Sequence, residues 1–208
     1  MIITHHGLEF FRIQFGDIVI ATNPPSKGSS VKGPRFGADI VLVSLKHSDF
    51  DGSAEMSFGN RTPFVIDGPG EYEIKDVVVR GFTSQTKYDG ESRMNTIYTL
   101  NLEGMQLAFL GAMGGSEIPN EAKEAFDKVD ILFLPIGGGL LSAKDAYKLV
   151  LSIEPAIVIP MHYDNDKAAL GAFLKEAGEE GEAPVEKLTL KKKDLEGKDA
   201  DIVVLKAV

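Results

Sequence analysis

Cysteine and tryptophan are both absent from this chain of 208 residues. Without cysteine the chain can form no disulfide, zinc ribbon, iron–sulfur cluster or thiol nucleophile. This absence fits a reducing compartment, and we predict a cytoplasmic protein. The opening segment, MIITHHGLEF, has no basic stretch followed by an apolar stretch, so it does not resemble a secretory signal. No apolar run approaches the roughly 20 residues that a membrane-spanning helix needs.

Positive charge is also scarce. The chain has 22 Lys and Arg residues against 31 Asp and Glu residues, which gives a formal net charge of −9. Such a surface repels phosphate backbones and anionic lipids, so we expect neither a nucleic acid nor a membrane as a partner. The hydrophobic content of 43% suits one compact domain over residues 1–208.

Strands dominate the first half of the sequence, and strands alternate with helices in the second. Glycine-containing turns at 16–17 and 103–104 separate strand pairs, and continuous apolar runs such as DIVLV suit strands that are buried on both faces. Asn120 and Ser142 are expected to cap two helices. The expected strands are 1–5, 10–15, 17–21, 39–43, 64–67, 71–74, 77–81, 96–102, 105–110, 131–134, 156–159, 187–190 and 201–205, and the expected helices are 120–128, 142–153 and 166–177.

Buried strands flanked by amphipathic helices predict an α/β fold with sheet layers covered by helices. A pseudo-duplicated αββα sandwich fits this order of elements. The pattern alone does not separate that sandwich from other α/β layouts.

Two of the four histidines follow the ends of buried strands. His47 stands in the sequence LKHSDFD, two residues before Asp49, and His162 stands in IPMHY. Loops beyond the carboxyl ends of strands commonly hold ligands and catalytic groups. Taken alone, an H-x-D spacing is a weak signal and favours a polar turn in which Asp49 accepts nearby backbone N–H groups.

A run of three glycines, 137–139, follows the apolar strand 131–134. It could cradle an anion at a helix N-terminus, or it could form a tight turn between strand and helix. The spacing matches neither a Walker A loop nor a dinucleotide fingerprint, so we favour the tight turn.

Several segments together resemble the metallo-β-lactamase superfamily. The motifs GPGEYEI, LPIGGG and IPMHY occur in this order, and the similar segments span most of residues 1–163. The branch most similar is the one related to ascorbate-6-phosphate lactonase, which contains zinc-dependent hydrolases of the β-lactamase fold. The resemblance implies an αββα sandwich with two mixed sheets and with metals at one edge of the sheets.

The family's defining H-x-H-x-D-H stretch reads Leu45-Lys46-His47-Ser48-Asp49-Phe50 in this chain. The resemblance therefore implies that the first and last histidine ligands are replaced by Leu45 and Phe50, whereas His47 and Asp49 are kept. The final histidine ligand of the family corresponds to His162.

Other family positions also differ. The G-H-S motif reads Gly7-Leu8-Glu9, an Asp-Pro reads Asn23-Pro24, and the Gly-Asp with the bridging carboxylate reads Gly111-Ala112. A further histidine ligand of the family falls near Lys87. Alanine cannot bridge a metal pair, and leucine and phenylalanine cannot coordinate a cation.

His47, Asp49 and His162 are thus the candidate metal ligands, for one metal at most. In the family they do not all serve the same ion, so we expect no cofactor, with a single Zn or Mn ion as the alternative. Catalytic residues are left unassigned, and the residues leave open whether the chain is an enzyme. The further pocket candidates are Asn23, Lys46, Lys87 and Tyr163. His6 is a minor candidate as a substitute ligand.

Three hypotheses follow. The first is a degenerate family member, a pseudoenzyme that has lost two-metal hydrolysis and acts in binding or assembly. The second is a mononuclear metal-dependent hydrolase of esters, lactones or phosphoesters that uses His47, Asp49 and His162. The third is metal-free acid–base chemistry with His47 or His162 as base and Lys46 or Lys87 as the binder of an anion. A small anionic molecule and a homo-oligomer are the expected partners.

Overall fold

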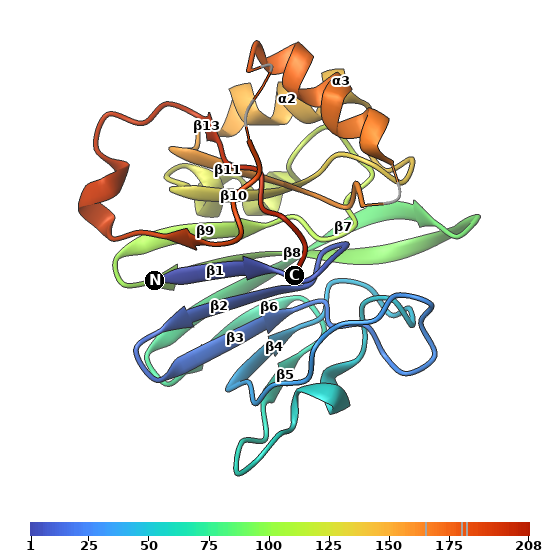
Figure 1. Ribbon diagram of the computed structural model, residues 1–208, viewed down its shortest axis with the longest axis vertical. Helices are drawn as coiled ribbons and strands as arrows, with labels where there is room; N and C mark the ends of the chain where they lie inside the picture. The colour runs from blue at the N-terminus through green and yellow to red at the C-terminus, as the bar shows by residue number, and fades with distance from the viewer. Residues whose placement is uncertain (165, 180, 182) are drawn as a thin grey trace.

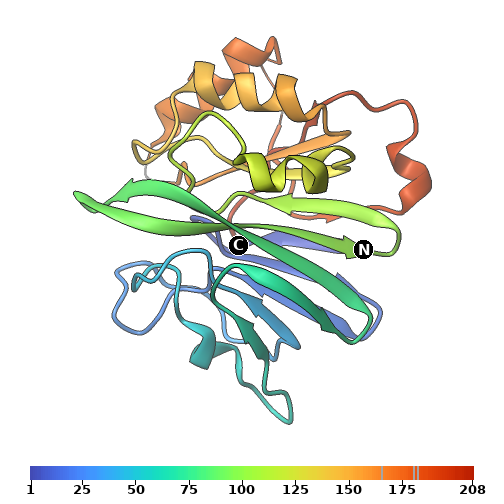
Figure 2. The same ribbon diagram turned by 180° about the vertical axis from the view of Figure 1, so that it is seen from behind.

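The computed structural model of the protein describes residues 1–164, 166–179, 181 and 183–208. These residues form two mixed β-sheets packed face to face, and the α-helices lie on the outer side of one of them (Figures 1 and 2). This architecture confirms the predicted α/β sandwich of two mixed sheets. One detail differs, because the outer face of the other sheet is covered by the loop at 23–37 and a short 3₁₀ turn instead of an α-helix.

The first sheet has six strands in the order β12-β1-β2-β3-β4-β5. Its early strands pair as antiparallel hairpins, whereas β3, β4 and β5 run parallel to one another. The turn at 16–17 joins β2 to β3 as predicted. The strands are β1 (Ile2–His5), β2 (Phe11–Phe15), β3 (Ile18–Thr22), β4 (Ile40–Leu42), β5 (Phe64–Ile66) and β12 (Leu188–Thr189).

The second sheet has seven strands in the order β13-β11-β10-β9-β8-β7-β6. Strands β9, β10, β11 and β13 are parallel, and the remaining pairs are antiparallel. The strands are β6 (Gly70–Ile74), β7 (Val77–Tyr88), β8 (Glu91–Leu102), β9 (Met105–Phe109), β10 (Ile131–Pro135), β11 (Ile157–Met161) and β13 (Asp201–Ile202).

The helices are few and short. Ser142 caps α2 as predicted, because its side chain accepts a hydrogen bond from Asp145 N. The predicted helix at 120–128 is instead a 3₁₀ turn followed by one turn of α-helix, and Pro119 takes the cap position that we assigned to Asn120. The helices are α1 (Lys123–Phe126), α2 (Ala143–Ile153) and α3 (Lys167–Ala177), with 3₁₀ turns η1 (Ser53–Met56), η2 (Asn120–Ala122) and η3 (Lys192–Leu195).

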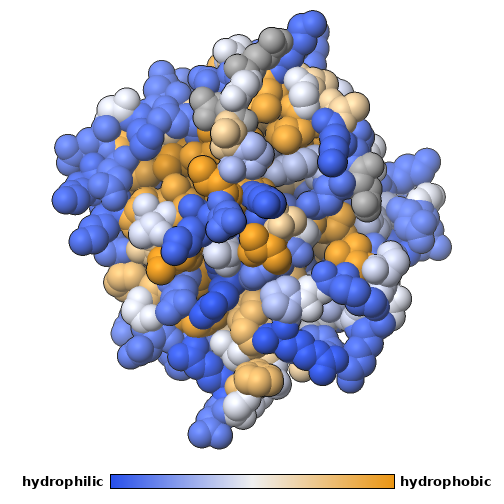
Figure 3. All heavy atoms as spheres, viewed as in Figure 1, coloured by the Kyte–Doolittle hydropathy of each residue, from blue (hydrophilic) through white to orange (hydrophobic). Residues whose placement is uncertain are grey.

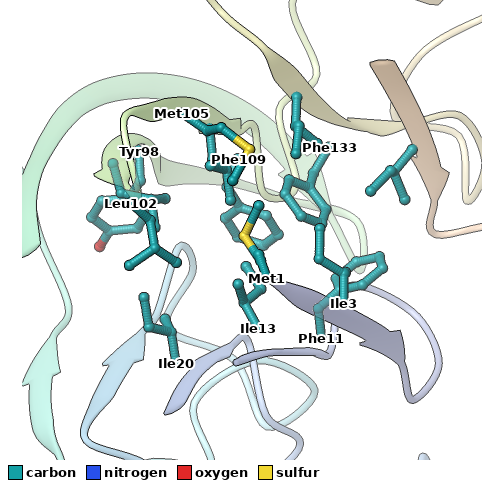
Figure 4. Close-up of a cluster of buried hydrophobic side chains, with 14 of the residues drawn as sticks. Met1, Ile3, Phe11, Ile13, Ile20, Tyr98, Leu102, Met105, Phe109 and Phe133 are labelled. Atoms are coloured by element: carbon teal, nitrogen blue, oxygen red, sulfur yellow. The ribbon is translucent and has the colours of Figure 1, made fainter. Parts of the chain in front are cut away.

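The main core lies between the two sheets. Side chains from the inner faces of both sheets interdigitate there, and Phe11 and Phe133 meet edge to face with ring centroids 4.9 Å apart (Figure 4). A second apolar cluster lies between the seven-stranded sheet and the helices, where Leu149 and Val150 of α2 are buried. Two apolar layers therefore hold the molecule together, and the sheets are the rigid support for the loops at their edge.

The β7–β8 hairpin is longer than the sequence suggested. We expected strands at 77–81 and 96–102, but β7 continues to Tyr88 and β8 begins at Glu91, with Asp89 and Gly90 as a two-residue turn in which both φ angles are positive. The extension was missed because residues 82–95 are mostly polar. Their burial alternates, however, because Ser84 and Thr86 are buried whereas Gln85 and Lys87 are exposed, which is the strand period.

The face seen in Figure 1 carries apolar surface in its middle, bordered by hydrophilic side chains (Figure 3). Among the described helices, none has the length and apolar character needed to cross a membrane.

Tyr98 joins the two sheets directly. It projects from β8 of the seven-stranded sheet and is fully buried. Its hydroxyl lies 2.7 Å from Val43 O and 3.2 Å from Ile66 O, at the ends of two strands of the other sheet. The single hydroxyl hydrogen of Tyr98 is therefore shared between two buried carbonyls of the facing sheet, and the shorter distance is to Val43 O.

Replacing Tyr98 with phenylalanine tests this link. Tyr98→Phe keeps the ring but removes the donor, so we expect the free energy of unfolding to fall by about 1–2 kcal/mol. Urea unfolding followed by circular dichroism measures the change. Tyr147→Phe, at a half-buried tyrosine of α2, is the control and should change the same quantity by less than about 0.5 kcal/mol. Equal effects of the two substitutions would contradict the link.

Candidate functional site

A cleft of about 640 Å³ opens where loops from both sheets meet. It lies beyond the ends of β1, β4 and β11, beside the turn after β10 and the tip of the β7–β8 hairpin. The three candidate ligands His47, Asp49 and His162 all line this cleft. The described lining residues are Leu8, Gly28, Ser30, Val31, His47, Ser48, Asp49, Tyr88, Asp89, Gly138, His162 and Asp166.

His162 is fixed by a buried carboxylate. Its Nδ1 lies 2.9 Å from Oε1 of Glu9, which is 0% exposed. The other oxygen of Glu9 accepts a hydrogen bond of 2.6 Å from Asn23 Nδ2. Because both carboxylate oxygens are acceptors, Nδ1 of His162 carries the proton in this network. The histidine ring is therefore held in one orientation, with Nε2 directed away from Glu9.

Asn23 links this pair to the strand before His47. Its Nδ2 donates to Ser44 Oγ at 2.7 Å, and its Oδ1 accepts from Ser44 N at 2.7 Å. Asn23 is fully buried and has a positive φ of 42°, a conformation that asparagine adopts more readily than most residues. Asn23, which we predicted as a pocket residue, thus lies behind the cleft and supports Glu9.

Asp49 is held by hydroxyl groups. Ser29 Oγ donates to Oδ1 at 2.5 Å, and Tyr88 OH donates to Oδ2 at 2.9 Å. His47 lies alongside, with its Nδ1 accepting from Asp49 N at 3.2 Å. The neutral His47 ring therefore carries its proton on Nε2, which lies 3.9 Å from Oδ2 of Asp89.

Tyr88 is the site residue that sequence reasoning missed. Its ring lies between the two retained histidines, with centroid separations of 4.9 Å to His47 and 5.8 Å to His162. Burial, followed by the hydrogen bond and negative charge of Asp49, raises the pKa of Tyr88 well above its usual range, so the hydroxyl stays a donor. We placed Lys87 at this point, but strand alternation directs Tyr88 inward and leaves Lys87 exposed.

An apolar cluster lies directly behind the cleft. Leu45, Phe50, Ala112 and Leu140 pack together, all buried, with half-buried Tyr88 against them. The Phe50 ring also approaches both histidines, with centroids 6.1 Å from His47 and 6.0 Å from His162. Hydrocarbon and aromatic carbon thus fill the space between the retained polar groups.

The predicted lysines lie outside the cleft. Lys46 is 75% exposed and forms an ion pair of 3.6 Å with Asp67, and Lys87 is exposed on the outer face of β7. Our prediction of both as pocket residues is therefore corrected. The metal-free hypothesis loses its anion-binding residues for the same reason, because neither lysine lines the cleft.

Tyr163 packs in the helix-side core, and its hydroxyl donates to Leu205 O at 3.1 Å. Burial raises its pKa to about 12. It does not line the cleft, so this pocket prediction is also corrected. His6 is likewise absent from the lining, since its Nδ1 lies 3.0 Å from Val208 O and its ring packs against Phe10 and Phe36.

The glycine run at 137–139 forms the tight turn that we favoured, and it makes room for His162. A Cβ on Gly137 would lie 2.4 Å from His162 O, and one on Gly138 would lie 2.5 Å from His162 Nε2. The run stands several residues before α2, so it is not an anion cradle at that helix N-terminus. His162 itself has a φ of 63°, and its N–H donates to Leu8 O at 2.9 Å.

The family model described as "Beta-lactamase superfamily domain" matches residues 2–162, which is more than half of the chain. This chain belongs to the β-lactamase superfamily. Curated relatives in the superfamily include a metal-dependent hydrolase of Thermoplasma acidophilum, 31% identical over 170 residues, which cover 71% of this chain and 74% of that protein. A metal-dependent hydrolase of Thermococcus onnurineus is 25% identical, over 71% of this chain and 75% of that protein.

Solved structures of the superfamily agree with this assignment. A metallo-β-lactamase superfamily protein from Thermotoga maritima superposes with a TM-score of 0.73 at 25% identity, covering 98% of this chain and 97% of that one. Igni18, a metallo hydrolase of Ignicoccus hospitalis, superposes with a TM-score of 0.61 at 18% identity, over 91% of this chain and 99% of that chain, which supports the fold. The predicted resemblance is confirmed at the level of family and fold.

The superfamily implies a metal centre, and the side chains at its expected position do not fit a metal pair. By the sequence resemblance Ala112 corresponds to the family's bridging carboxylate, and its methyl group is buried with Leu45 and Phe50. The described residues contain no group of three or more His, Cys, Asp or Glu side chains that could hold an ion. Asp49 already accepts from two hydroxyls, and Glu9 from His162 and Asn23. The assignment of His47, Asp49 and His162 as ligands of one ion remains a prediction.

Buried His5 gives the folding stability of the protein a pH dependence. Its Nε2 lies 3.2 Å from Leu8 O and its Nδ1 3.3 Å from Leu205 O, in a fully buried position. Burial lowers the pKa of His5, and burial also lowers the pKa of its neighbour His6. Around the ordinary histidine pKa, the unfolded chain therefore binds more protons than the folded one.

We expect stability to fall as the pH is lowered from about 8 to about 5.5, because protonation of free histidine favours the unfolded chain over that range. Each histidine can contribute at most about 1.4 kcal/mol per pH unit to the slope. Urea unfolding at several pH values measures that slope. The double variant His5→Gln/His6→Gln should flatten it, whatever its absolute stability, and an unchanged slope would show that other groups are responsible.

Proposed function

We propose that this chain is a β-lactamase-superfamily scaffold that binds a small molecule in its cleft through side chains and has lost two-metal hydrolysis. The observation that carries the proposal is the buried cluster of Leu45, Phe50 and Ala112 at the positions where the family has two histidine ligands and the bridging carboxylate. The cleft beside the cluster stays open, with about 640 Å³ of space. Ligand sites of small molecules commonly have volumes of about 300–1,000 Å³.

Electrostatic considerations support the proposed loss of the metal pair. A metal dication at this position would exchange its water for carbon atoms of Leu45 and Phe50, and a buried charge without compensating ligands is strongly unfavourable. Two zinc ions normally take three protein ligands each, together with a shared carboxylate. His47, Asp49 and His162 are too few for that arrangement.

The remaining polar groups suit recognition. In the neutral tautomers that the hydrogen bonds select, His47 presents an Nε2–H donor and His162 presents an Nε2 acceptor. Tyr88 contributes an aromatic surface between them. A ligand can therefore meet a donor, an acceptor and a ring within one cleft, on groups that are already held in place by Asp49 and Glu9.

A second candidate is a metal-dependent hydrolase of esters, lactones or phosphoesters that uses His47, Asp49 and His162. The names of the relatives favour this candidate over the loss of activity, since they are called metal-dependent hydrolases. The two candidates make opposite predictions for metal content.

We expect the purified protein to hold only substoichiometric zinc and manganese. It is incubated with an excess of either ion and desalted, and the metal content is measured by mass spectrometry. The variant His47→Ala/His162→Ala, treated in the same way, reports the background of surface binding. The proposal expects the same trace amount in both proteins, because no complete ligand set is available in the cleft.

About one tightly bound ion per chain in the wild type, lost in the double variant, would overturn the proposal and support the second candidate. Hydrolysis of bis(4-nitrophenyl) phosphate and of 4-nitrophenyl acetate gives an independent readout. Activity that requires added metal and disappears in His162→Ala would have the same meaning.

A further inference from the structure

We propose that Asp89, at the tip of the β7–β8 hairpin, is a site of spontaneous conversion to isoaspartate, a modification that changes the backbone beside the cleft. The proposal is independent of the binding function, because it concerns the chemistry of the chain itself. The sequence contains Asp-Gly at three places, 51–52, 67–68 and 89–90. Glycine after aspartate favours this reaction, since it has no Cβ to hinder the approach of its nitrogen to the carboxyl group.

The reaction needs only water. The backbone nitrogen of Gly90 attacks Cγ of the Asp89 carboxylic acid, and the acid's hydroxyl leaves with the proton of that nitrogen as one molecule of water. The product is a five-membered succinimide ring. A second water opens the ring at Cγ, which restores aspartate, or at the main-chain carbonyl, which gives isoaspartate with the chain running through Cγ. Nothing is oxidised or reduced, and the product is an isomer of the original chain.

Both reacting groups at the hairpin tip are accessible. The tip projects beyond the body of the two sheets (Figure 1), and the Asp89 side chain is 77% exposed. Its contact with Nε2 of His47 spans 3.9 Å, beyond hydrogen-bond distance. Gly90 is exposed, and its N–H has no hydrogen-bond partner among the described residues. The turn is flanked by the pair Tyr88 and Glu91, and a tip with so few buried contacts opens readily.

The Asp51-Gly52 pair is the opposite case. Gly52 is buried, and its N–H donates to Pro24 O at 2.7 Å. A Cβ on Gly52 would lie 2.3 Å from Pro25 O, so the backbone is tightly packed there. The nitrogen must lose its hydrogen bond, and the loop must open, before the ring can close.

The Asp67-Gly68 pair is intermediate. Asp67 forms an ion pair of 3.6 Å with Lys46, and the Gly68 carbonyl accepts a hydrogen bond of 3.2 Å from the Tyr72 hydroxyl. Pro69 follows directly and restricts the backbone of Gly68. The structure therefore ranks the three sites, with Asp89 the most reactive and Asp51 the least.

The modification reaches the cleft through Tyr88. Isoaspartate adds one methylene group to the backbone, so the two-residue turn can no longer join Tyr88 to Glu91 in the same register. The Tyr88 hydroxyl, which donates to Asp49, then loses its fixed position. Ageing at one exposed turn thus alters the aromatic wall between His47 and His162.

Ageing of the full chain tests the proposal. The folded protein is kept at body temperature for several weeks beside a sample unfolded in guanidinium chloride. Both are digested, and liquid chromatography with electron-transfer fragmentation distinguishes isoaspartate from aspartate in each peptide. In the folded chain we expect about tenfold more isoaspartate at Asp89 than at Asp51, the factor set by one buried hydrogen bond, with Asp67 between them. In the unfolded sample the three sites should differ little.

Two variants report on ring closure at the tip. Asp89→Asn closes the same ring with ammonia as the leaving group, which departs more readily, so isoaspartate should form faster at position 89. Asparagine tolerates the φ of 51° there. Asp89→Glu cannot close a five-membered ring and should show no isomer at this position. Glutamate is compatible with such a backbone, because Glu103 and Glu154 have φ angles of 57° and 51°.

The proposal fails if the folded chain accumulates as much isoaspartate at Asp51 or Asp67 as at Asp89. It also fails if isoaspartate at Asp89 is confined to the unfolded sample, since the folded turn would then hold the nitrogen away from the carboxyl carbon. The absence of any acceleration in Asp89→Asn would carry the same meaning.

Discussion

The hydrogen bond between Glu9 and His162 joins the two halves of the chain at the edge of the sandwich. Glu9 follows the first strand of the six-stranded sheet, and His162 follows β11 of the other sheet, 153 positions later. A carboxylate with no exposure is unfavourable unless it is paired, and His162 together with Asn23 provides that compensation. This pair sets the geometry of the cleft. Because Nδ1 of His162 is bonded to Glu9, only Nε2 of the ring is available on the cleft side.

The rest of the site divides into a polar half and an apolar half. The hydroxyl groups of Ser29 and Tyr88 donate to Asp49, the residue that the sequence resemblance predicts as a metal ligand. Leu45, Phe50 and Ala112 close the space behind it. The two features are consistent with the proposed loss of two-metal hydrolysis. A carboxylate that accepts from two hydroxyls has less need of a cation, and the apolar side chains behind it offer no ligand atoms.

Much of the fold could be predicted from sequence because it depends on local patterns. The apolar runs of β10 and β11, the turn at 16–17 and the Ser142 cap each carry their own signal. The polar arm of the β7–β8 hairpin was missed, since neither of its faces is apolar enough to show the strand period clearly. Its Asp89-Gly90 turn was the signal that could have revealed it.

The candidate site was less predictable, and the reason is physical. Glu9 and Tyr88 acquire their roles through contacts with residues 153 and 39 positions away, which no local pattern reports. Strand alternation would have directed Tyr88 inward and Lys87 outward, once the hairpin was known. Membership of the superfamily is decided by strands and turns that position the cleft, whereas the chemistry depends on a handful of side chains that can change while the fold persists. The proposed loss of two-metal hydrolysis is therefore compatible with relatives that share this fold and are named metal-dependent hydrolases.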